Sequence, residues 1–385
     1  MDVSSNMQTA ENVKHIRSSY IREILSAATN EGVISLAGGL PAKDLLPHQL
    51  LQQAMVEVSK NREVFQYGET QGHRGLLEYL TQSYGLNPEQ SILVTTGSQQ
   101  GLDLIARTFI NPGDNVVLEA PSYLGALQVF SLARANIHTV QQVENGPDLI
   151  ALKALFESRT VKFFYAVPDF HNPTGICWSQ ETRLSVAKLC REFNVVLIED
   201  APYRELRFSG KAVPLVSSFC PECSIVLRSA SKVSAPGLRL GFVTGPEQWI
   251  SDLAKIKQVA DLHSCLPMQA VLLELYRHPE YRVYLQNVRN HYLQRYSTLA
   301  DAIRCYLPSD VSFSEVEGGM FLWLRLAHGN PMDIAKLALN NGVAVVPGDV
   351  FYTNENNFLP ALRLNFSYCT PDKLKVAMKI LAKII

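Results

Sequence analysis

The feature that most constrains the fold of this chain is an alternation between short apolar runs and longer amphipathic stretches. The runs are SILVTT (91–96), NVVLEA (115–120), VKFFYAV (161–167), VVLIED (195–200), SIVLRSA (224–230) and LGFVTG (240–245). Helix-like segments such as GLDLIARTF (101–109) and QETRLSVAKLCREF (180–193) lie between them. Repeated βα units of this kind predict an α/β fold with a mostly parallel sheet. Because VVLI and FFYAV are apolar at almost every position, we expect helices on both faces of their strands.

The pattern changes after residue 250, where helical periodicity dominates. The helix-like stretches are AKIKQVADLH (254–263), PMQAVLLELY (267–276) and the segment 281–307. Strand-like runs follow at MFLWLRL (320–326), VAVVPG (343–348) and LRLNFS (362–367), and then a closing helix. This order indicates a smaller α+β domain reached through long helices. The expected division is an N-terminal arm with a helix at SSYIREILSAA in 1–35, which joins the small domain, a large domain in 36–270, and a small domain with interdomain helices in 271–385.

Charge and composition exclude several classes of protein. The formal net charge is −1, so we expect no general attraction to nucleic acid or to an anionic membrane. The sequence has no run of about 18 apolar residues and no signal-peptide core, so we expect a cytoplasmic protein without a membrane span. The cysteines include the pair Cys220 and Cys223, but no second pair or histidines at ligand spacing follow. We therefore expect reduced thiols and no metal site.

Polar clusters follow several of the predicted strands, which is where an α/β sheet binds its ligands. TTGSQQG (95–101) follows a strand and opens a helix, so its backbone amides and the Ser98 hydroxyl could bind a phosphate. An ordinary helix start would also explain it. The strand VVLIED ends on Glu199 and Asp200, and Asp200 could pair with a buried cationic group while Tyr203 donates to an adjacent oxygen. A helix-capping aspartate is the alternative.

Two further loops carry groups that suit a bound anion. In PDFHNPTG (168–175) a turn at Asn172-Pro173 could aim the amide at a ligand, although turn chemistry alone would also account for it. In SASKVSAPGLRLG (229–241), Ser229, Ser231 and Arg239 could bind a phosphate dianion. Lys232 in the same loop is well placed to form a Schiff base with a phosphorylated aldehyde. A solvated lysine would explain Lys232 alone but not the whole set.

In chain order the sequence contains Tyr67-Gly68, Gly97-Ser98-Gln99, Pro121-Ser122-Tyr123, Asn172-Pro173-Thr174-Gly175, Asp200-x-x-Tyr203, Ser229-x-Ser231-Lys232 and Arg363. This series resembles the fold-type-I, pyridoxal-phosphate-dependent aminotransferases, and most of all the class I branch with the 2-aminoadipate and kynurenine aminotransferases. The similarity runs from about residue 18 to the C-terminus. The resemblance implies the aminotransferase fold of type I and pyridoxal 5'-phosphate as cofactor.

The resemblance also implies roles for single residues. Lys232 would hold the cofactor as a Schiff base and later move a proton, and Asp200 would pair with the ring nitrogen. Tyr203 and Asn172 would contact the ring hydroxyl, and Tyr123 would stack on the ring. The phosphate-binding residues would be Ser98, Gln99 through its backbone amide, Ser229, Ser231 and Arg239. Tyr67 would reach the phosphate of the neighbouring subunit, which implies a homodimer.

For the substrate, the resemblance assigns the α-carboxylate to Arg363, whose planar fork suits it. Gly39, with Gly38 in LAGGLP, would pass close over the substrate, where a side chain would collide. Asn172 would also contact the substrate. Arg22 would contact a distal carboxylate, although a surface arginine is the alternative for that position.

The implied reaction is transfer of an amino group between an L-amino acid, acidic or aromatic by preference, and a 2-oxo acid such as 2-oxoglutarate, in a ping-pong mechanism through Lys232. One alternative is another pyridoxal-phosphate reaction on the same fold, a β-lyase or a decarboxylase, because a fold does not decide which bond breaks. The other is a transaminase-like regulator domain. Only about 35 residues precede ISLAGGLP, too few for the winged-helix domain of such a regulator, and no basic patch is present.

Overall fold

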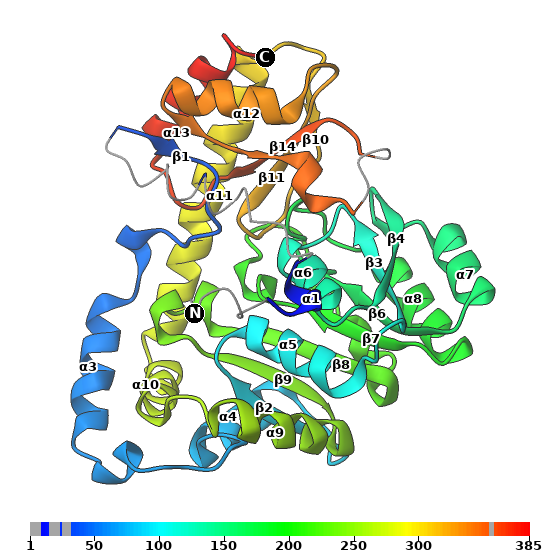
Figure 1. Ribbon diagram of the computed structural model, residues 1–385. Coiled ribbons are helices and arrows are strands. Elements are labelled where there is room, and N and C mark those ends of the chain that lie inside the picture. Colours follow the sequence, from blue (N-terminus) through cyan, green and yellow to red (C-terminus); the bar gives the residue numbers. More distant parts are fainter. Residues whose placement is uncertain (1–8, 15–23, 25–31, 354–357) are drawn as a thin grey trace, which may run out of the picture.

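The computed structural model describes residues 9–14, 24, 32–353 and 358–385 (Figure 1). Its main element is an eight-stranded sheet with the order β2-β9-β8-β7-β6-β3-β4-β5. The strands are β2 (Gln90–Thr95), β3 (Asn115–Ala120), β4 (Asn136–Val143), β5 (Gly146–Pro147), β6 (Val161–Ala166), β7 (Val196–Asp200), β8 (Ser224–Ser229) and β9 (Gly241–Pro246). Each of the apolar runs before residue 250 therefore contains a strand, as the sequence predicted.

Most neighbouring strands of this sheet are parallel, which confirms the predicted α/β class. The segment β8-β7-β6-β3-β4 is parallel throughout, whereas β9 is antiparallel to both β8 and β2. The reason lies in the connection 230–240, which holds only the two 3-10 turns η7 (Ala230–Lys232) and η8 (Pro236–Leu238). A parallel neighbour would need a crossover of a dozen or more residues, usually a helix. This short connection carries Lys232.

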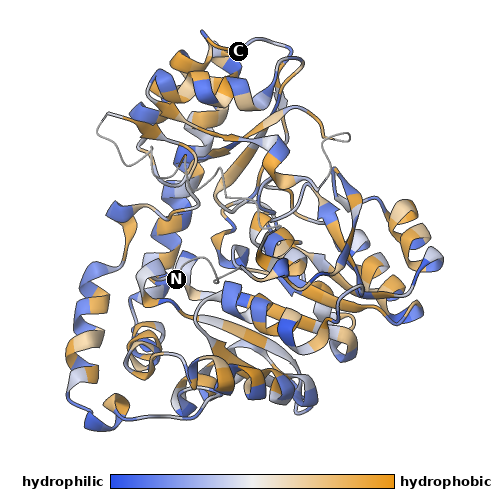
Figure 2. Ribbon diagram, viewed as in Figure 1, coloured by the Kyte–Doolittle hydropathy of each residue, from blue (hydrophilic) through white to orange (hydrophobic). Residues whose placement is uncertain are grey.

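Alternating side chains of the strands pack on opposite faces of the sheet. Val116 and Leu118 of β3 pack with α5 (Ser98–Phe109), α6 (Leu124–Leu132) and α9 (Glu247–Asp261). Val117, between them, packs with α7 (Leu149–Ser158) and α8 (Gln180–Glu192). Figure 2 shows hydrophobic colouring along the strands and mixed colouring on the helices around them. The strands are apolar at almost every position because each face of the sheet packs against a layer of helices.

Three more helices cover the end of the sheet formed by β2 and β9. They are α3 (His48–Ser59), α4 (Arg74–Tyr84) and α10 (Leu266–Arg277), and their apolar residues form one cluster with Ile92, Val94 and Phe242. A short helix, α1 (Glu11–Lys14), lies beside α6 (Figure 1).

A smaller, antiparallel sheet lies beyond the large one, with the order β10-β11-β14-β13. Its strands are β10 (Ser312–Phe313), β11 (Phe321–Arg325), β13 (Val346–Pro347) and β14 (Ala361–Asn365), and its helices are α11 (Tyr281–Tyr306), α12 (Pro331–Asn340) and α13 (Pro371–Leu381). In Figure 1, α11 runs from the region of the large sheet to the small one. The sequence run 343–348 divides into two strands, because β12 (Val343–Ala344) pairs instead with β1 (Ile34–Ser35).

The predicted N-terminal helix at 18–28 lies outside the described residues except for Ile24, which is buried. Within the described part of the chain, no helix is long and apolar enough to cross a membrane. Strands β2, β3, β6, β7 and β8 all run in one direction, so their carboxyl ends meet at one edge of the large sheet. β14 of the small sheet carries Arg363 to the same place.

Candidate active site

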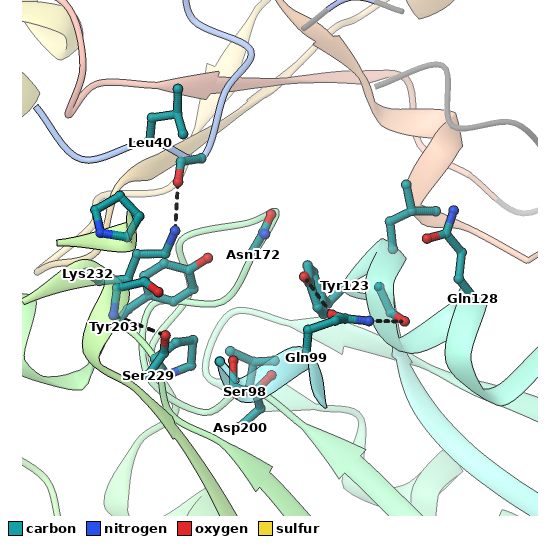
Figure 3. A pocket seen from close by; sticks show the side chains of 18 of the residues that line it. Leu40, Ser98, Gln99, Tyr123, Gln128, Asn172, Asp200, Tyr203, Ser229 and Lys232 are labelled. Carbon is teal, nitrogen blue, oxygen red and sulfur yellow. Dashed lines mark hydrogen bonds between the residues drawn. The ribbon is translucent and has the colours of Figure 1, made fainter. Parts of the chain in front are cut away.

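A cavity of about 560 Å³ lies at this edge, between the large sheet and the small one (Figure 3). It is lined by the predicted site residues Gly39, Ser98, Gln99, Tyr123, Asn172, Asp200, Tyr203, Ser229, Ser231, Lys232, Arg239 and Arg363. These residues come from separate strand ends and loops, so the fold brings together what the sequence spreads over more than three hundred positions.

One predicted residue among those described, Tyr67, does not line this cavity. Tyr67 is 79% exposed, and its ring packs edge-on against His263 with the ring centroids 5.9 Å apart. Arg22 lies outside the described residues.

One end of the cavity is suited to an anion. Helix α5 begins at Ser98, and its N-cap Gly97 has φ 81° and offers no side-chain acceptor, so the first amides of the helix stay available. Arg239 lies close by, with Nη2 3.4 Å from the Thr96 carbonyl oxygen. A Cβ on Gly97 would stand 2.9 Å from that Nη2. The positive φ favours glycine at this position, and the absence of a Cβ lets the guanidinium approach closely.

Lys232 ends the turn η7, and its Nζ donates to the Gly39 carbonyl oxygen at 2.7 Å (Figure 3). Withdrawal from water, together with the positive charges of Arg363 and Arg239, lowers the pKa of Lys232 to about 8. An amine with such a pKa is uncharged in about a tenth of the molecules at pH 7 and in about half of them at pH 8, far more often than an ordinary lysine. It is therefore a competent nucleophile and proton acceptor.

Asp200 is the last residue of β7 and is 5% exposed. Its Oδ2 accepts a hydrogen bond from the Tyr165 hydroxyl at 2.7 Å, and its Oδ1 has no partner among the described residues. Burial raises the pKa of Asp200 to about 7, against the opposing effect of the Tyr165 hydrogen bond. A buried oxygen without a donor suits a ligand that brings an N–H group.

The neighbouring Glu199 points to the other face of the sheet because side chains alternate along a strand. Its two carboxylate oxygens accept the backbone N–H groups of Val216, at 3.0 Å, and Ser217, at 2.8 Å. Of the two acidic residues at this strand end, only Asp200 lines the cavity.

Arg363, carried by β14, also lines the cavity and is 4% exposed. Its Nη1 donates to Asn172 Oδ1 at 2.8 Å, its Nη2 donates to the Ala37 carbonyl oxygen, and its Nε has no partner among the described residues. The guanidinium lies 4.4 Å from the ring centre of Phe321. Burial lowers the pKa of Arg363 to about 10, so it remains charged at neutral pH. Such a group can bind a carboxylate bidentately once it gives up the amide oxygen.

Two tyrosines form the walls between these charged groups. The hydroxyl of Tyr123 donates to Gln99 Oε1 at 3.1 Å, and burial raises the pKa of Tyr123 to about 12. Tyr203 packs edge-on against Phe321 with the ring centroids 5.8 Å apart, and burial raises its pKa as well. Both phenols therefore keep their protons at neutral pH.

The sequence reasoning missed several residues of the cavity, among them Tyr165, Gln128, Leu40 and Phe351. Tyr165 lies inside the apolar run VKFFYAV, where a tyrosine looks like any other buried aromatic residue. Its one available signal was its alternation with Phe164, which places it on the other face of the strand. Phe351 lies between β13 and β14, in a 3-10 turn (η9, Gly348–Phe351) that no motif marks.

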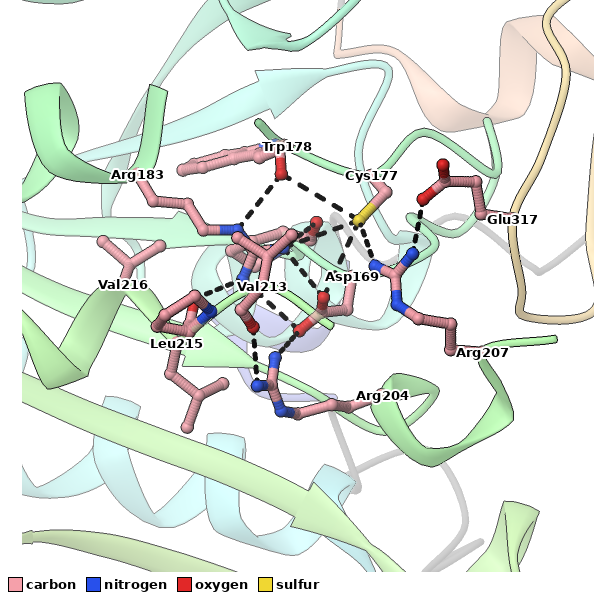
Figure 4. A network of polar contacts seen from close by, with 12 residues as sticks. Asp169, Cys177, Trp178, Arg183, Arg204, Arg207, Val213, Leu215, Val216 and Glu317 are labelled. Atoms are coloured by element: carbon pink, nitrogen blue, oxygen red, sulfur yellow. Dashed lines mark hydrogen bonds and ion pairs between the residues drawn. The ribbon is translucent and has the colours of Figure 1, made fainter. Parts of the chain in front are cut away.

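A buried polar network behind the cavity was also missed (Figure 4). Asp169 accepts hydrogen bonds from Arg183 Nη2 at 2.8 Å and from Arg204 Nη1 at 2.9 Å. Burial alone would raise the pKa of Asp169, but the two arginines outweigh it and lower the pKa. Arg183, fully buried, also donates to the Pro168 carbonyl oxygen at 3.0 Å. These bonds anchor the start of the turn that carries Asn172.

A second part of this network joins the two sheets. Arg207 is paired with Glu317, and its Nη2 donates to Cys177 Sγ at 3.0 Å (Figure 4). The backbone N–H groups of Phe208 and Ser209 both donate to the Glu317 carbonyl oxygen. The loop after Tyr203 is thus bound to the loop that precedes β11.

A profile of the family described as aminotransferase class I and II matches residues 31–381 of this chain. A 2-aminoadipate transaminase of Thermus thermophilus is 35% identical over 372 residues, with 94% of this chain and 92% of that protein covered. An aromatic-amino-acid aminotransferase of Thermococcus litoralis is 32% identical over 390 residues, with 98% of this chain and 93% of that protein covered.

Among solved structures, the α-aminoadipate aminotransferase LysN of Thermus thermophilus, complexed with N-(5'-phosphopyridoxyl)-L-leucine, matches with a TM-score of 0.91 and 33% identity. The match covers 98% of this chain and 96% of that one, which confirms the predicted fold type over both sheets. The chain belongs to the class I and II aminotransferases and is an enzyme that transfers amino groups.

Proposed function

We propose that this enzyme transfers the amino group of an acidic or aromatic L-amino acid to a 2-oxo acid such as 2-oxoglutarate, with pyridoxal 5'-phosphate as cofactor. The observation that carries the proposal is Lys232, an amine with a pKa lowered to about 8 that lines one cavity together with Asp200 and Arg363. A nucleophile, a buried acid and a carboxylate-binding fork are the groups that amino transfer needs.

The cavity fits pyridoxal phosphate on several independent points. The unpartnered Oδ1 of Asp200 matches a protonated ring nitrogen, which would supply the missing donor. The open amino end of α5, with Ser98, Arg239 and the serines at the end of β8, matches a phosphate dianion. Lys232 would hold the aldehyde carbon. When bound, the cofactor supplies an electron sink for the pair left behind when a bond at the substrate Cα breaks.

The residues of the chain would provide binding and proton transfer. Arg363 would bind the α-carboxylate and so orient the Cα–H bond, in exchange for its present contact with Asn172. Nζ of Lys232 would take up the Cα proton, because its lowered pKa leaves the amine uncharged, with a free electron pair, far more often than an ordinary lysine. Asp200 would stay ionised beside the ring nitrogen, and the neutral hydroxyl of Tyr203 would donate to the ring oxygen.

The order of substrates follows from the number of carboxylate sites. An amino acid and a 2-oxo acid both carry a carboxylate next to the reacting carbon, and Arg363 is the guanidinium assigned to it. Two substrates that need the same group must bind in turn, which supports a ping-pong mechanism.

Other residues that line the cavity bear on the choice of donor. Leu40 and Phe351 are apolar and Gln128 carries one amide, so a long side chain with a planar or polar end would fit. Figure 3 shows Leu40 above Lys232 and Gln128 at the opposite side of the view. The names of the two curated relatives, for 2-aminoadipate and for aromatic amino acids, support the same range. Contact between Arg22 and a distal carboxylate stays a proposal for a residue outside the described part of the chain.

We also propose a homodimer in which Tyr67 of each subunit reaches the phosphate site of the other. An aromatic residue that is 79% exposed in one chain would then be covered in the assembly. A cytoplasmic location remains a prediction.

The test of the reaction is a panel of amino acids with 2-oxoglutarate, with the products separated and identified. We expect glutamate and the 2-oxo acid of the donor in equal amounts, with acidic and aromatic donors fastest. Ammonia with pyruvate would instead identify a β-lyase, and release of carbon dioxide would identify a decarboxylase. The Arg22→Ala variant, assayed with 2-aminoadipate and with phenylalanine, tests the distal contact, since only the acidic donor should lose rate.

A further inference from the structure

We propose that Tyr165 is a positioning residue for Asp200: its hydroxyl fixes the carboxylate so that Oδ1 faces the ring nitrogen of the cofactor and stays ionised there. This inference rests on the proposed function, since it concerns the contact between Asp200 and pyridoxal phosphate. It goes beyond the motifs of the family described above, none of which includes Tyr165.

The sheet register places the two residues together. In the parallel pair β6–β7, Tyr165 is the partner of Ile198, so Asp200 lies two residues farther along β7 and on the same face. The long tyrosine side chain spans this distance, and its hydroxyl reaches Oδ2 at 2.7 Å.

The tyrosine ring is itself held in place. Tyr165 is 1% exposed, and its ring packs edge-on against Phe130 of α6 with the ring centroids 6.1 Å apart. A ring enclosed by the core has little rotational freedom, so the position of its hydroxyl is defined before any ligand binds. The hydroxyl therefore acts as a fixed donor.

Among the described residues, Tyr165 is the one side chain that donates a hydrogen bond to the Asp200 carboxylate. Oδ2 accepts from Tyr165, and Oδ1 is buried with no donor from the described residues. One oxygen is thus committed to the protein and the other is left for a ligand. Without the hydroxyl, both oxygens would lack a donor, and the carboxylate could rotate or take up a proton.

The electrostatic surroundings favour the same role. The titratable groups that act on Asp200 from the packed elements are the phenols of Tyr123, Tyr165 and Tyr203, and burial raises the pKa of each. All three are neutral near pH 7. The Tyr165 hydrogen bond is then the interaction that opposes the effect of burial on the pKa of Asp200. Its loss would favour the protonated acid, which cannot form an ion pair with a protonated ring nitrogen.

The test compares two cofactors on the Tyr165→Phe variant. Cofactor-free protein is titrated with pyridoxal phosphate and with the analogue that has carbon in place of the ring nitrogen. We expect the variant to bind pyridoxal phosphate about tenfold more weakly than the wild type, as loss of a hydrogen bond to a charged group implies. Binding of the analogue should stay unchanged, because it offers nothing to Asp200. The ¹⁵N chemical shift of ring-labelled cofactor should move toward the unprotonated form in the variant.

The matched control is Tyr292→Phe, which removes the hydroxyl of another tyrosine that is 1% exposed but lies in α11, with Ala42 as its partner. It should bind both cofactors as the wild type does. Equal losses for both cofactors in Tyr165→Phe would show a merely structural role and overturn the proposal, and so would an unchanged affinity and ¹⁵N shift.

The wild-type protein separates this inference from the proposed function. A wild type that binds neither cofactor would contradict the proposed function. A wild type that binds both equally well would contradict the role of Asp200, and the role of Tyr165 with it. If Tyr165→Phe does not fold, the ¹⁵N shift of the wild type decides: a ring nitrogen that is unprotonated near neutral pH would overturn the proposal.

Discussion

Lys232 is an amine whose charge is disfavoured by its own surroundings. Its pKa is lowered to about 8, so the folded chain holds this proton less firmly than the unfolded chain does. Below pH 8 the amine is charged in both the folded and the unfolded chain, and burial of that charge lowers the free energy of unfolding. This destabilisation disappears as the pH rises from about 8 toward the ordinary lysine pKa, because the folded chain then holds the amine uncharged. The residue that the reaction needs most is therefore a source of instability in the protein without cofactor.

Replacement of Lys232 by methionine, which has a similar shape and no charge, should make this visible. Near neutral pH the cofactor-free Lys232→Met protein should melt at a higher temperature than the cofactor-free wild type. The difference should shrink at about pH 10, where the wild-type amine is neutral in the folded state. Thermal unfolding of both proteins at the two pH values measures it. A difference that does not change with pH would contradict the lowered pKa.

Arg363 gives the second prediction at this scale. The Arg363→Lys variant keeps the charge but loses the planar fork, so it should lose about 10- to 100-fold in kcat/KM for both the amino acid and the 2-oxo acid. Initial-rate kinetics with each substrate varied in turn measure this. The control is Arg325→Lys on the adjacent strand β11, whose guanidinium donates to Ser314 Oγ and does not line the cavity. A loss for only one of the two substrates would contradict the shared carboxylate site.

The residues that the motifs named and the residues that line the cavity largely coincide, because strand ends and glycine or proline turns leave marks in a sequence. Tyr165 left no such mark, since it contacts Asp200 only through the pairing of two strands. Tyr67 is the opposite case: the sequence motif names it, but it is exposed in the single chain. The phosphate site assigned to it would belong to another chain.

At the scale of elements, the apolar runs predicted the strands well but not all of their directions or partners. The sequence of β9 resembles the other apolar runs, yet β9 is antiparallel to β8. The connection between them, which carries Lys232, is too short for a crossover. The run 343–348 reads as one strand, yet it divides between two partners. Direction and pairing depend on the connections and on distant segments, which the periodicity of a run does not contain.

The turn at 168–175 is the element whose support can be tested most simply. Arg183 is fully buried and paired with Asp169, so Arg183→Met would leave the buried carboxylate with Arg204 as its one remaining ion-pair partner among the described residues. We expect a loss of about 3 kcal/mol in the free energy of unfolding, measured by denaturant titration. The control is Arg107→Met in α5, whose ion pair with Asp103 is exposed, with an expected loss below about 0.5 kcal/mol. Similar losses for both variants would contradict the structural role of the buried pair.

At the scale of the whole molecule, the proposed dimer makes each cavity depend on two chains. The domain boundaries after residues 35 and 270 stay a prediction, whereas the position of the cavity between the two sheets is a property of the described structure. If Tyr67 completes the phosphate site of the partner, two impaired variants with different substitutions should complement each other in a mixed dimer.

The experiment mixes Tyr67→Ala with Lys232→Ala under conditions that allow subunits to exchange. In a mixed dimer, the cavity with an intact Lys232 faces an intact Tyr67, so this cavity should recover the wild-type affinity for pyridoxal phosphate. Activity is measured at a cofactor concentration that saturates the wild type but not the Tyr67→Ala dimer. We expect the mixture to exceed the sum of the two separate proteins. Activity equal to that sum, with exchange verified, would contradict a shared site.

The central claim is that one cavity transfers an amino group through Lys232, and a single half-reaction tests it most directly. Enzyme loaded with pyridoxal phosphate is mixed with 2-aminoadipate or an aromatic amino acid, without any 2-oxo acid. The account predicts one molecule of the corresponding 2-oxo acid per bound cofactor, a matching change in the cofactor's absorbance, and its reversal with formation of glutamate when 2-oxoglutarate is added. Lys232→Ala should show neither step at the wild-type rate. Continued turnover without an acceptor, with release of ammonia or carbon dioxide, would contradict the account.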